Sequence, residues 1–234
     1  SNELKGGRAM STTYIRWFET LSKLDVTIAG GKGANLGEMT QAGLPVPPGF
    51  AVSAGAYRDF IAAGLSDLMT ARIAELNVED HVQLESAASQ LQAAIRSSAV
   101  PSAIASELIA AYEDLCARTG QKDVAVAVRS SATMEDTEAA SFAGMNRSFL
   151  NVRGTDELLQ QLREVWASLY SPRVIYYRRQ LALEAEPEIA VIVQQMINSE
   201  TSGVAFSIDP STGDPSTIVI EGAFGLGETV VSGQ

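Results

Sequence analysis

The 234-residue sequence contains very little cysteine or histidine, with one residue of each. A single cysteine cannot form a disulfide within the chain, and this favours a reducing compartment, so we predict a cytoplasmic protein. Cys116 stands in the helical pattern ELIAAYEDLCARTG, which indicates a small buried side chain better than a nucleophile. His81 stands near the expected start of a helix, where a solvated or capping role is favoured over catalysis.

Basic residues are also scarce, with 17 Lys and Arg against 28 Asp and Glu and a net charge of -11. A nucleic-acid-binding surface needs a basic footprint, so we expect no nucleic-acid partner. A local basic pocket for a small polyphosphate stays compatible with this charge. No apolar run approaches the roughly 20 residues of a membrane span and no secretory signal is seen, so we expect no membrane partner either.

The hydrophobic pattern predicts an α+β protein with a partly helical first part and a sheet-rich end. Residues 1–9, SNELKGGRA, are interpreted as a cloning remnant ahead of Met10. Apolar residues recur every three or four positions in residues 66–119, which predicts a helical scaffold block. Strands are predicted at 124–128, ending on Arg129, and at 147–152, and the residues from 186 onward form strands with turns, one of them at Gly222. Further helices are predicted at 32–42, 54–63, 155–170 and 172–185.

A glycine-rich stretch, TIAGGKGANLGEM at residues 27–39, leads into one of these helices. It is not a P-loop, because glycine follows Lys32 where a P-loop needs Ser or Thr. It is not G-x-G-x-x-G either, since the third glycine comes one residue late, at Gly37. Glycines beside a lysine are typical of phosphate sites, but glycine clusters also serve as helix caps or tight turns. The stretch alone leaves both interpretations open.

Two later segments offer further groups for an anion. Arg129 can reach a phosphate with its planar guanidinium, or it can pair with acids of the following loop, namely Glu135, Asp136 and Glu138. Gly144 ends the segment SFAG, whose backbone N–H groups can form an anion-binding nest or a plain β-turn.

The sheet-rich end contains two more candidates. The apolar run VIV stops at Gln194 and Gln195, and a strand end beside Met196 suits a flat heterocycle such as adenine, or is an ordinary hairpin. Glu221 and Glu228 flank a glycine-rich turn. Carboxylates near a phosphate site suit Mg²⁺, but the same segment is also compatible with a hinge that carries surface acids.

Taken in order, six motifs resemble one family. They are GGKGANLGEM, GLPVPPGFAVS, VAVRSSATMEDTEAASFAG, LYSPRVIYYRRQ, AVIVQQMINSETSGVAFSIDP and GAFGLGETVVSG. Over residues 21–234 the chain resembles the N-terminal nucleotide-binding domain of the phosphoenolpyruvate synthase and pyruvate phosphate dikinase family, which includes rifampicin phosphotransferase. The resemblance implies an ATP-grasp-type domain of two subdomains, truncated at its C-terminus. Residues 10–185 would form the first subdomain, with residues 66–119 as a helical insert, and residues 186–234 would begin the second.

The resemblance also implies roles for individual residues. Lys32 and Arg129 would contact the phosphates of ATP and supply electrostatic stabilisation during catalysis. Gly144 would close over these phosphates with its loop. Ser148 stands where the family has a threonine and keeps the hydroxyl group.

The implied adenine site and metal site lie further along the chain. Gln195 and Met196 would contact the adenine, and Glu228 is a further nucleotide-binding candidate. Met145 departs from the glutamine usual in the family, which puts one polar contact near the phosphate loop in doubt. The Mg²⁺ ligands of the family, a glutamate and a Gln-x-Arg segment, are expected beyond Gln234, so no residue here is predicted as a metal ligand.

The implied activity of the longer protein converts ATP, pyruvate and water into phosphoenolpyruvate, AMP and phosphate through a phosphohistidine. That histidine is expected on a downstream domain, followed by a phosphoenolpyruvate/pyruvate domain, and both are expected partners of this chain. The 234 residues alone are therefore expected to be inactive. Two alternatives stay open, a rifampicin phosphotransferase-like enzyme and a nucleotide-binding module without catalysis.

Overall fold

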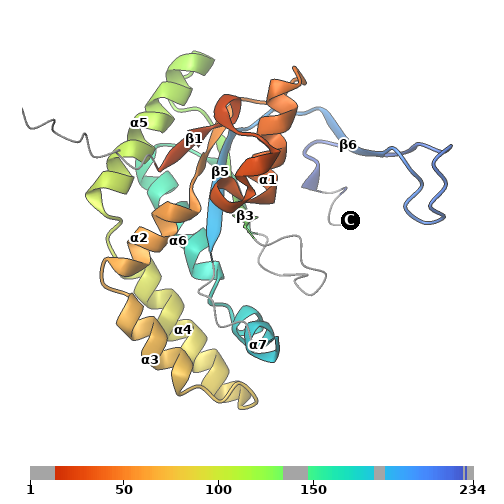
Figure 1. Ribbon diagram of the computed structural model, residues 1–234. Coiled ribbons are helices and arrows are strands. Elements are labelled where there is room, and N and C mark those ends of the chain that lie inside the picture. The colour runs from red at the N-terminus through yellow and green to blue at the C-terminus, as the bar shows by residue number, and fades with distance from the viewer. Residues whose placement is uncertain (1–13, 134–146, 182–187, 229, 231–234) are drawn as a thin grey trace, which may run out of the picture. The chain divides into compact units, whose positions relative to one another are not determined.

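The computed structural model describes residues 14–133, 147–181, 188–228 and 230. Contacts divide the chain into two compact units, Ser1–Met196 and Ile197–Gln234, which are described separately below (Figure 1). The first unit combines helices with an antiparallel sheet, and the second is built on a pair of strands. The predicted α+β class is confirmed.

The first unit is built on a five-stranded sheet with the order β1-β2-β5-β3-β4, in which all neighbours pair antiparallel. The strands are β1 (Ile15–Trp17), β2 (Gly49–Val52), β3 (Val126–Ala132), β4 (Ser148–Val152) and β5 (Ile189–Gln195). Since β5 lies between β2 and β3, it belongs to the first unit. The first compact unit therefore extends to Met196, and the subdomain bounds of 10–185 and 186–234 stay a prediction.

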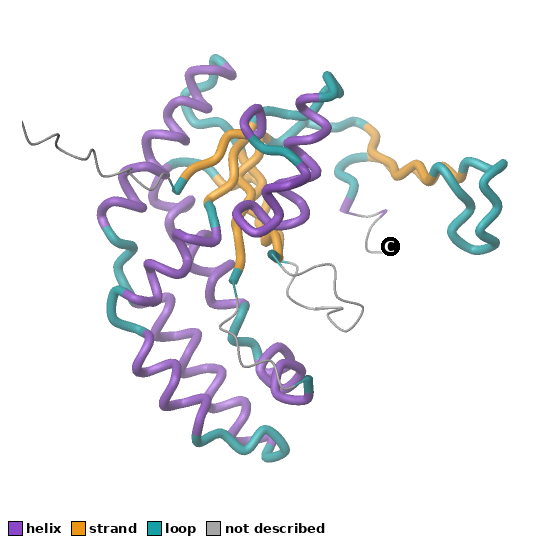
Figure 2. The backbone as a smooth tube through the Cα atoms, in the orientation of Figure 1, coloured by secondary structure: helices purple, strands orange, loops and turns teal. Residues whose placement is uncertain are grey.

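Helices pack on both sides of these strands (Figure 2). They are α1 (Val26–Gln41), α2 (Ala54–Ala62), α3 (Ser66–Ala74), α4 (His81–Ser97), α5 (Ser102–Thr119), α6 (Thr155–Ser168) and α7 (Pro172–Gln180), with 3₁₀ turns at Phe18–Thr20 and Lys23–Asp25. The helical block expected at 66–119 is confirmed by α3, α4 and α5. Asp80 is the N-cap of α4, so His81 does not cap this helix. The side chain of His81 is exposed, as its predicted solvated role requires. Within the described ranges, no helix is long and apolar enough to cross a membrane.

The two faces of the sheet carry cores of different size. On one face, β3 and β5 pack with α2, α5 and α6 in the main core, where Trp166 stacks on Phe60 with 4.6 Å between ring centroids. Cys116 is buried there, as predicted. On the other face, α1 covers a small core of five buried residues, Phe18, Leu21, Ala29, Ala51 and Ile192. Most of the apolar stabilisation therefore lies on the first face.

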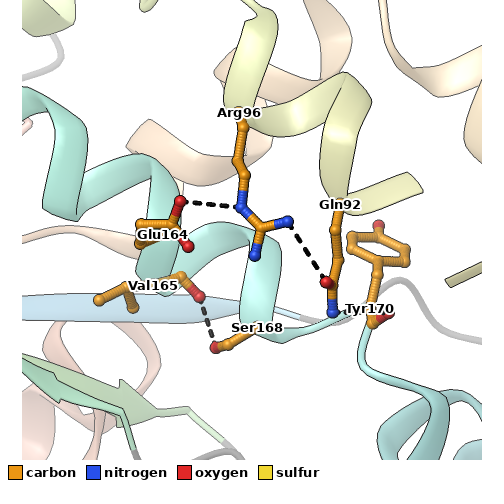
Figure 3. A network of polar contacts seen from close by, with 6 residues as sticks. All are labelled: Gln92, Arg96, Glu164, Val165, Ser168 and Tyr170. Carbon is orange, nitrogen blue, oxygen red and sulfur yellow. Dashed lines mark hydrogen bonds and ion pairs between the residues drawn. The ribbon is translucent and has the colours of Figure 1, made fainter. Parts of the chain in front are cut away.

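Polar contacts join α4 to α6 beside the main core (Figure 3). Arg96 Nε donates to Glu164 Oε1 at 2.8 Å, and both side chains are partly exposed, so this ion pair contributes little to stability. Within α6, the buried Ser168 hydroxyl donates to the Val165 carbonyl oxygen at 2.6 Å. A buried hydroxyl group is thus satisfied within its own helix.

Several predicted element boundaries are wrong. The strand predicted at 124–128 runs from Val126 to Ala132, so Arg129 lies inside the strand and does not end it. The polar residues that suggested a loop are buried in the sheet, where the Ser130 hydroxyl accepts the Arg147 N–H at 2.9 Å. The helix predicted at 172–185 ends at Gln180, and residues 182–187 lie outside the described ranges.

The second unit contains an antiparallel pair, β6 (Thr201–Phe206) and β7 (Val219–Phe224). The predicted turn at Gly222 is wrong, because Gly222 pairs with Gly203 inside the ladder, and the positive φ of 80° falls at Gly225. In the connection between the strands, hydrogen bonds from the side chain and backbone of Ser216 lower the pKa of Asp214.

The main core predicts the effect of a large-to-small substitution. Phe60→Ala should lower the free energy of unfolding by about 3–5 kcal/mol, because the fully buried ring leaves a cavity beside Trp166. Val82→Ala, at a side chain that is 80% exposed, is the control and should change stability by less than about 0.5 kcal/mol. Urea denaturation measures both variants. Equal effects would contradict the assignment of Phe60 to the core.

Candidate functional site

The face of the sheet under α1 carries a cationic side chain and a hydroxyl group from adjacent strands. Arg129 of β3 lies directly opposite Ser148 of β4 and Ile192 of β5. Opposed residues of antiparallel strands share a face, and Ile192 belongs to the small core under α1. The side chains of Arg129 and Ser148 therefore project from this face. Arg129 is half-buried and Ser148 is exposed.

The surroundings of Arg129 bear on its two predicted roles. Of the residues that the structure describes, no carboxylate forms an ion pair with it. The acids named as alternative partners, Glu135, Asp136 and Glu138, lie outside the described ranges, and so does Gly144. The choice between phosphate contact and a loop salt bridge stays a prediction.

The glycine-rich stretch forms a kinked helix that lies against β3. Gly30 interrupts α1 with φ 69° and ψ 172°, a backbone conformation that residues other than glycine rarely adopt. A Cβ at Gly30 would overlap the hydroxyl and carbonyl oxygens of Ser131 on β3. A Cβ at Gly33 would lie 3.1 Å from Ile192 Cδ1. Two of the glycines thus allow close packing of α1 on the sheet, which supports the structural interpretation of the cluster.

Lys32 is placed by the same packing. It is half-buried in the first turn after the kink, on the helix that covers the Arg129 face. The next residue, Gly33, donates its N–H to the Ser131 hydroxyl at 3.3 Å. The positive end of a helix dipole and a lysine thus occur on one short segment, which suits an anion. The structure therefore brings Lys32, Arg129 and Ser148 to one side of the sheet.

The residues predicted for adenine lie at the end of β5. The backbone N–H of Gln195 donates to the Pro48 carbonyl at 3.0 Å, and that of Met196 donates to the Ala125 carbonyl at 2.8 Å. Gln195 pairs with Val126, a residue of the main core, so its register places it on the opposite face from Arg129. Gln195 therefore lies at the end of β5, on a different face from the phosphate candidates.

Glu228, the last predicted site residue, is exposed and belongs to the second unit. In the part of the chain that the structure describes, no three or more His, Cys, Asp and Glu side chains are grouped as a metal site. The predicted role of Glu228 toward a nucleotide stays a prediction.

One cavity lies away from all of these residues. It has a volume of about 830 Å³ and lies between the end of α5 and the start of α6. Tyr112 lines it and is held in place there, since its hydroxyl donates to the Val124 carbonyl and accepts the Gly154 N–H, both at 2.8 Å. Burial raises the pKa of this phenol. No predicted site residue lines the cavity.

Ser131 was not among the predicted site residues. It carries no charge, and it follows Arg129 in the segment VAVRSSATMEDTEAASFAG without a predicted role of its own. The available signal was its position two residues after Arg129, because alternate residues of a strand share a face.

A glycine-kinked helix with a lysine, packed on a strand with an arginine, defines an α+β domain suited to an anionic ligand. Comparison with known proteins is more specific. Residues 26–234 match the family described as "Pyruvate phosphate dikinase, AMP/ATP-binding domain", and the chain belongs to that family.

Similar proteins are found among archaeal enzymes. A probable phosphoenolpyruvate synthase of Methanothermobacter thermautotrophicus is 48% identical over 223 residues, which covers 94% of this chain and 32% of the relative. The phosphoenolpyruvate synthase of Pyrococcus furiosus is 40% identical over 258 residues, which covers 96% of this chain and 32% of the relative. A probable phosphoenolpyruvate synthase of Archaeoglobus fulgidus is 45% identical, which covers 94% of this chain and 29% of the relative. The chain thus spans about a third of the length of these relatives.

The contact of α1 with β3 predicts different effects of alanine at two glycines that share a positive φ. Gly43→Ala, with φ 77° and open space around it, should cost about 1–2 kcal/mol from backbone strain alone. Gly30→Ala should cost about 1–3 kcal/mol more, because the added Cβ also overlaps Ser131. Urea denaturation compares the two variants. Equal losses would show that α1 does not lie this close to β3.

Proposed function

We propose that the α1 face of the sheet binds the phosphates of ATP, with Lys32 and Arg129 as the cationic contacts. The observation that carries the proposal is the convergence of Arg129, Ser148 and the helix bearing Lys32 on one face. Membership of a family described as AMP/ATP-binding supports ATP as the ligand. Arg129 offers a planar fork for two phosphate oxygens and Lys32 offers a point charge.

The position of the adenine is part of the same proposal. Arg129 pairs with Ile192, and Gln195 lies three residues further along β5. At the rise of a strand this separation is about 10 Å, which is comparable to the extent of a nucleoside triphosphate. A nucleotide with its base against Gln195 and Met196 therefore follows β5 towards Arg129, passing from the strand end onto the α1 face. Gly144 and Glu228 stay predicted nucleotide contacts, as the ATP-grasp-type resemblance implies.

For the protein to which this chain belongs, we propose the reaction of a phosphoenolpyruvate synthase. The similar archaeal proteins are named as phosphoenolpyruvate synthases, which favours this reaction over transfer to an antibiotic. ATP, pyruvate and water would give phosphoenolpyruvate, AMP and phosphate. In the transfer of a phosphoryl group, charge shifts onto oxygens, and fixed cations stabilise that charge. Lys32 and Arg129 have this electrostatic role and form no covalent intermediate.

The proposed phosphoryl carrier is a histidine on a further domain of the longer protein. His81 is unsuited to that task, since it is exposed at the start of α4, a helix that packs with the main core and not under α1. The Mg²⁺ expected for ATP is assigned no step here, because the described residues include no group of ligands for it. A reducing, cytoplasmic setting is retained in the proposal on account of the unpaired, buried Cys116.

The proposal predicts the outcome of a calorimetric titration with ATP and Mg²⁺. Lys32→Ala and Arg129→Ala should each weaken binding by about 10- to 100-fold, because each removes a charge-assisted contact to phosphate. The charge-matched controls are the single variants Lys122→Ala and Arg72→Ala, each of which removes one exposed cation elsewhere in the first unit and should bind as the unmodified chain does. Unchanged binding in the Arg129 variant would contradict the assigned face.

A second prediction concerns catalysis by the 234 residues alone. Incubation with ATP, Mg²⁺ and pyruvate should produce no AMP and no phosphoenolpyruvate, because the proposed carrier histidine lies on another domain. Phosphorus NMR or a coupled assay measures both products. Formation of phosphoenolpyruvate by these residues would contradict the proposal that the carrier histidine lies on another domain.

A further inference from the structure

Ser131 is a buried polar residue of the segment VAVRSSATMEDTEAASFAG that the proposed phosphate contacts do not include. Its exposed fraction is 0%, and it lies on β3 opposite Ala190 of β5. Because strand residues alternate between faces, Ser131 shares the α1 face with Arg129. Its hydroxyl oxygen accepts the N–H of Gly33, 98 residues earlier in the chain.

The hydrogen bond from Gly33 gives an acceptor to a backbone N–H in the first turn of a helical segment, where the helix itself provides none. Gly30 is the last non-helical residue before the second part of α1, so it takes the position of an N-cap, but it has no side chain. An N-cap side chain normally accepts the N–H of the second or third helical residue. Gly33 is the third residue after Gly30, and Ser131 provides the oxygen from the neighbouring strand. The absence of a Cβ at Gly30 leaves the space in which this hydroxyl lies.

We propose that Ser131 is a positioning residue, which caps the Lys32 helix from the strand that carries Arg129 and so aligns the two phosphate-binding cations. This inference rests on the proposed ATP site. Lys32 lies between Gly30 and Gly33, the two residues that contact Ser131, while Arg129 lies two residues from Ser131 on its own strand. One hydroxyl thus ties the backbone beside the lysine to the backbone beside the arginine. Ser131 does not contact the phosphate itself, and it affects phosphate binding by positioning Lys32.

A double-mutant cycle measured by calorimetry tests the proposal. Ser131→Ala should weaken ATP binding by about five- to tenfold, the cost of a lost N-cap expressed in affinity. In a Lys32→Ala background the same substitution should have almost no further effect, because the group that it positions is already absent. Adenosine, which lacks phosphates, should bind equally to Ser131→Ala and to the unmodified chain. Equal fold-losses in both backgrounds, or an equal loss for adenosine, would overturn the proposal.

Ser168→Ala is the matched control for the loss of a buried serine hydroxyl. It removes a hydrogen bond within α6, seen in Figure 3, and should leave ATP binding unchanged. A loss of affinity in this control equal to that of Ser131→Ala would show that general destabilisation explains both, which would also overturn the proposal.

Hydrogen exchange of the Gly33 amide separates this inference from the proposed function. Ser131→Ala should speed exchange of this amide by several-fold without any ligand, because its acceptor is lost. Unchanged exchange would overturn the capping role even if ATP binds as proposed. Failure of the unmodified chain to bind ATP, together with faster exchange in the variant, would overturn the proposed function and the alignment of cations, and would leave only the cap.

Discussion

The close packing of Gly30 against Ser131 is the constraint on which the candidate site depends. A Cβ at Gly30 would overlap the hydroxyl and carbonyl oxygens of Ser131, so the backbone of the helix lies directly on this residue of β3. A positive φ at Gly30 then turns the chain into a second helical segment whose first turn contains Lys32. The same contact determines how far Lys32 lies from Arg129, because both residues are within a few positions of it.

The two faces of the sheet differ in how much apolar surface they bury. The main core fills one face with large side chains from α2, α5 and α6, and it provides most of the apolar burial. The other face has a core of only five buried residues under α1. Polar and charged side chains, which would be costly in the main core, are therefore accommodated on the α1 face. A thinly covered face on a rigid sheet is a suitable place for a ligand that carries several negative charges.

Much of the fold could be predicted from local patterns. The recurrence of Leu84, Leu91 and Ile95 identified α4 because a helix repeats its buried face every three or four residues. The boundaries of β3 were predicted poorly because Ser130 and Ser131 are polar, and polar residues after an apolar run suggest a loop. Ser130 bonds to Arg147, just before β4, and Ser131 bonds to Gly33 of α1, and no local pattern reveals these partners. The central place of β5 in the sheet could not be predicted for the same reason, since its neighbours in the sheet are distant in sequence.

The sequence alone determined the helical periods and the resemblance to a family, and the family match over residues 26–234 confirmed that resemblance. Only the tertiary structure decided that Arg129 and Ser148 share a face, that Gln195 projects from the other one, and that Ser131 caps the lysine helix. The physical reason is the separation along the chain of the residues that interact. Periodicity reports on neighbours within a few residues, whereas strand register and the contact between Ser131 and Gly33 join segments that are far apart in the chain.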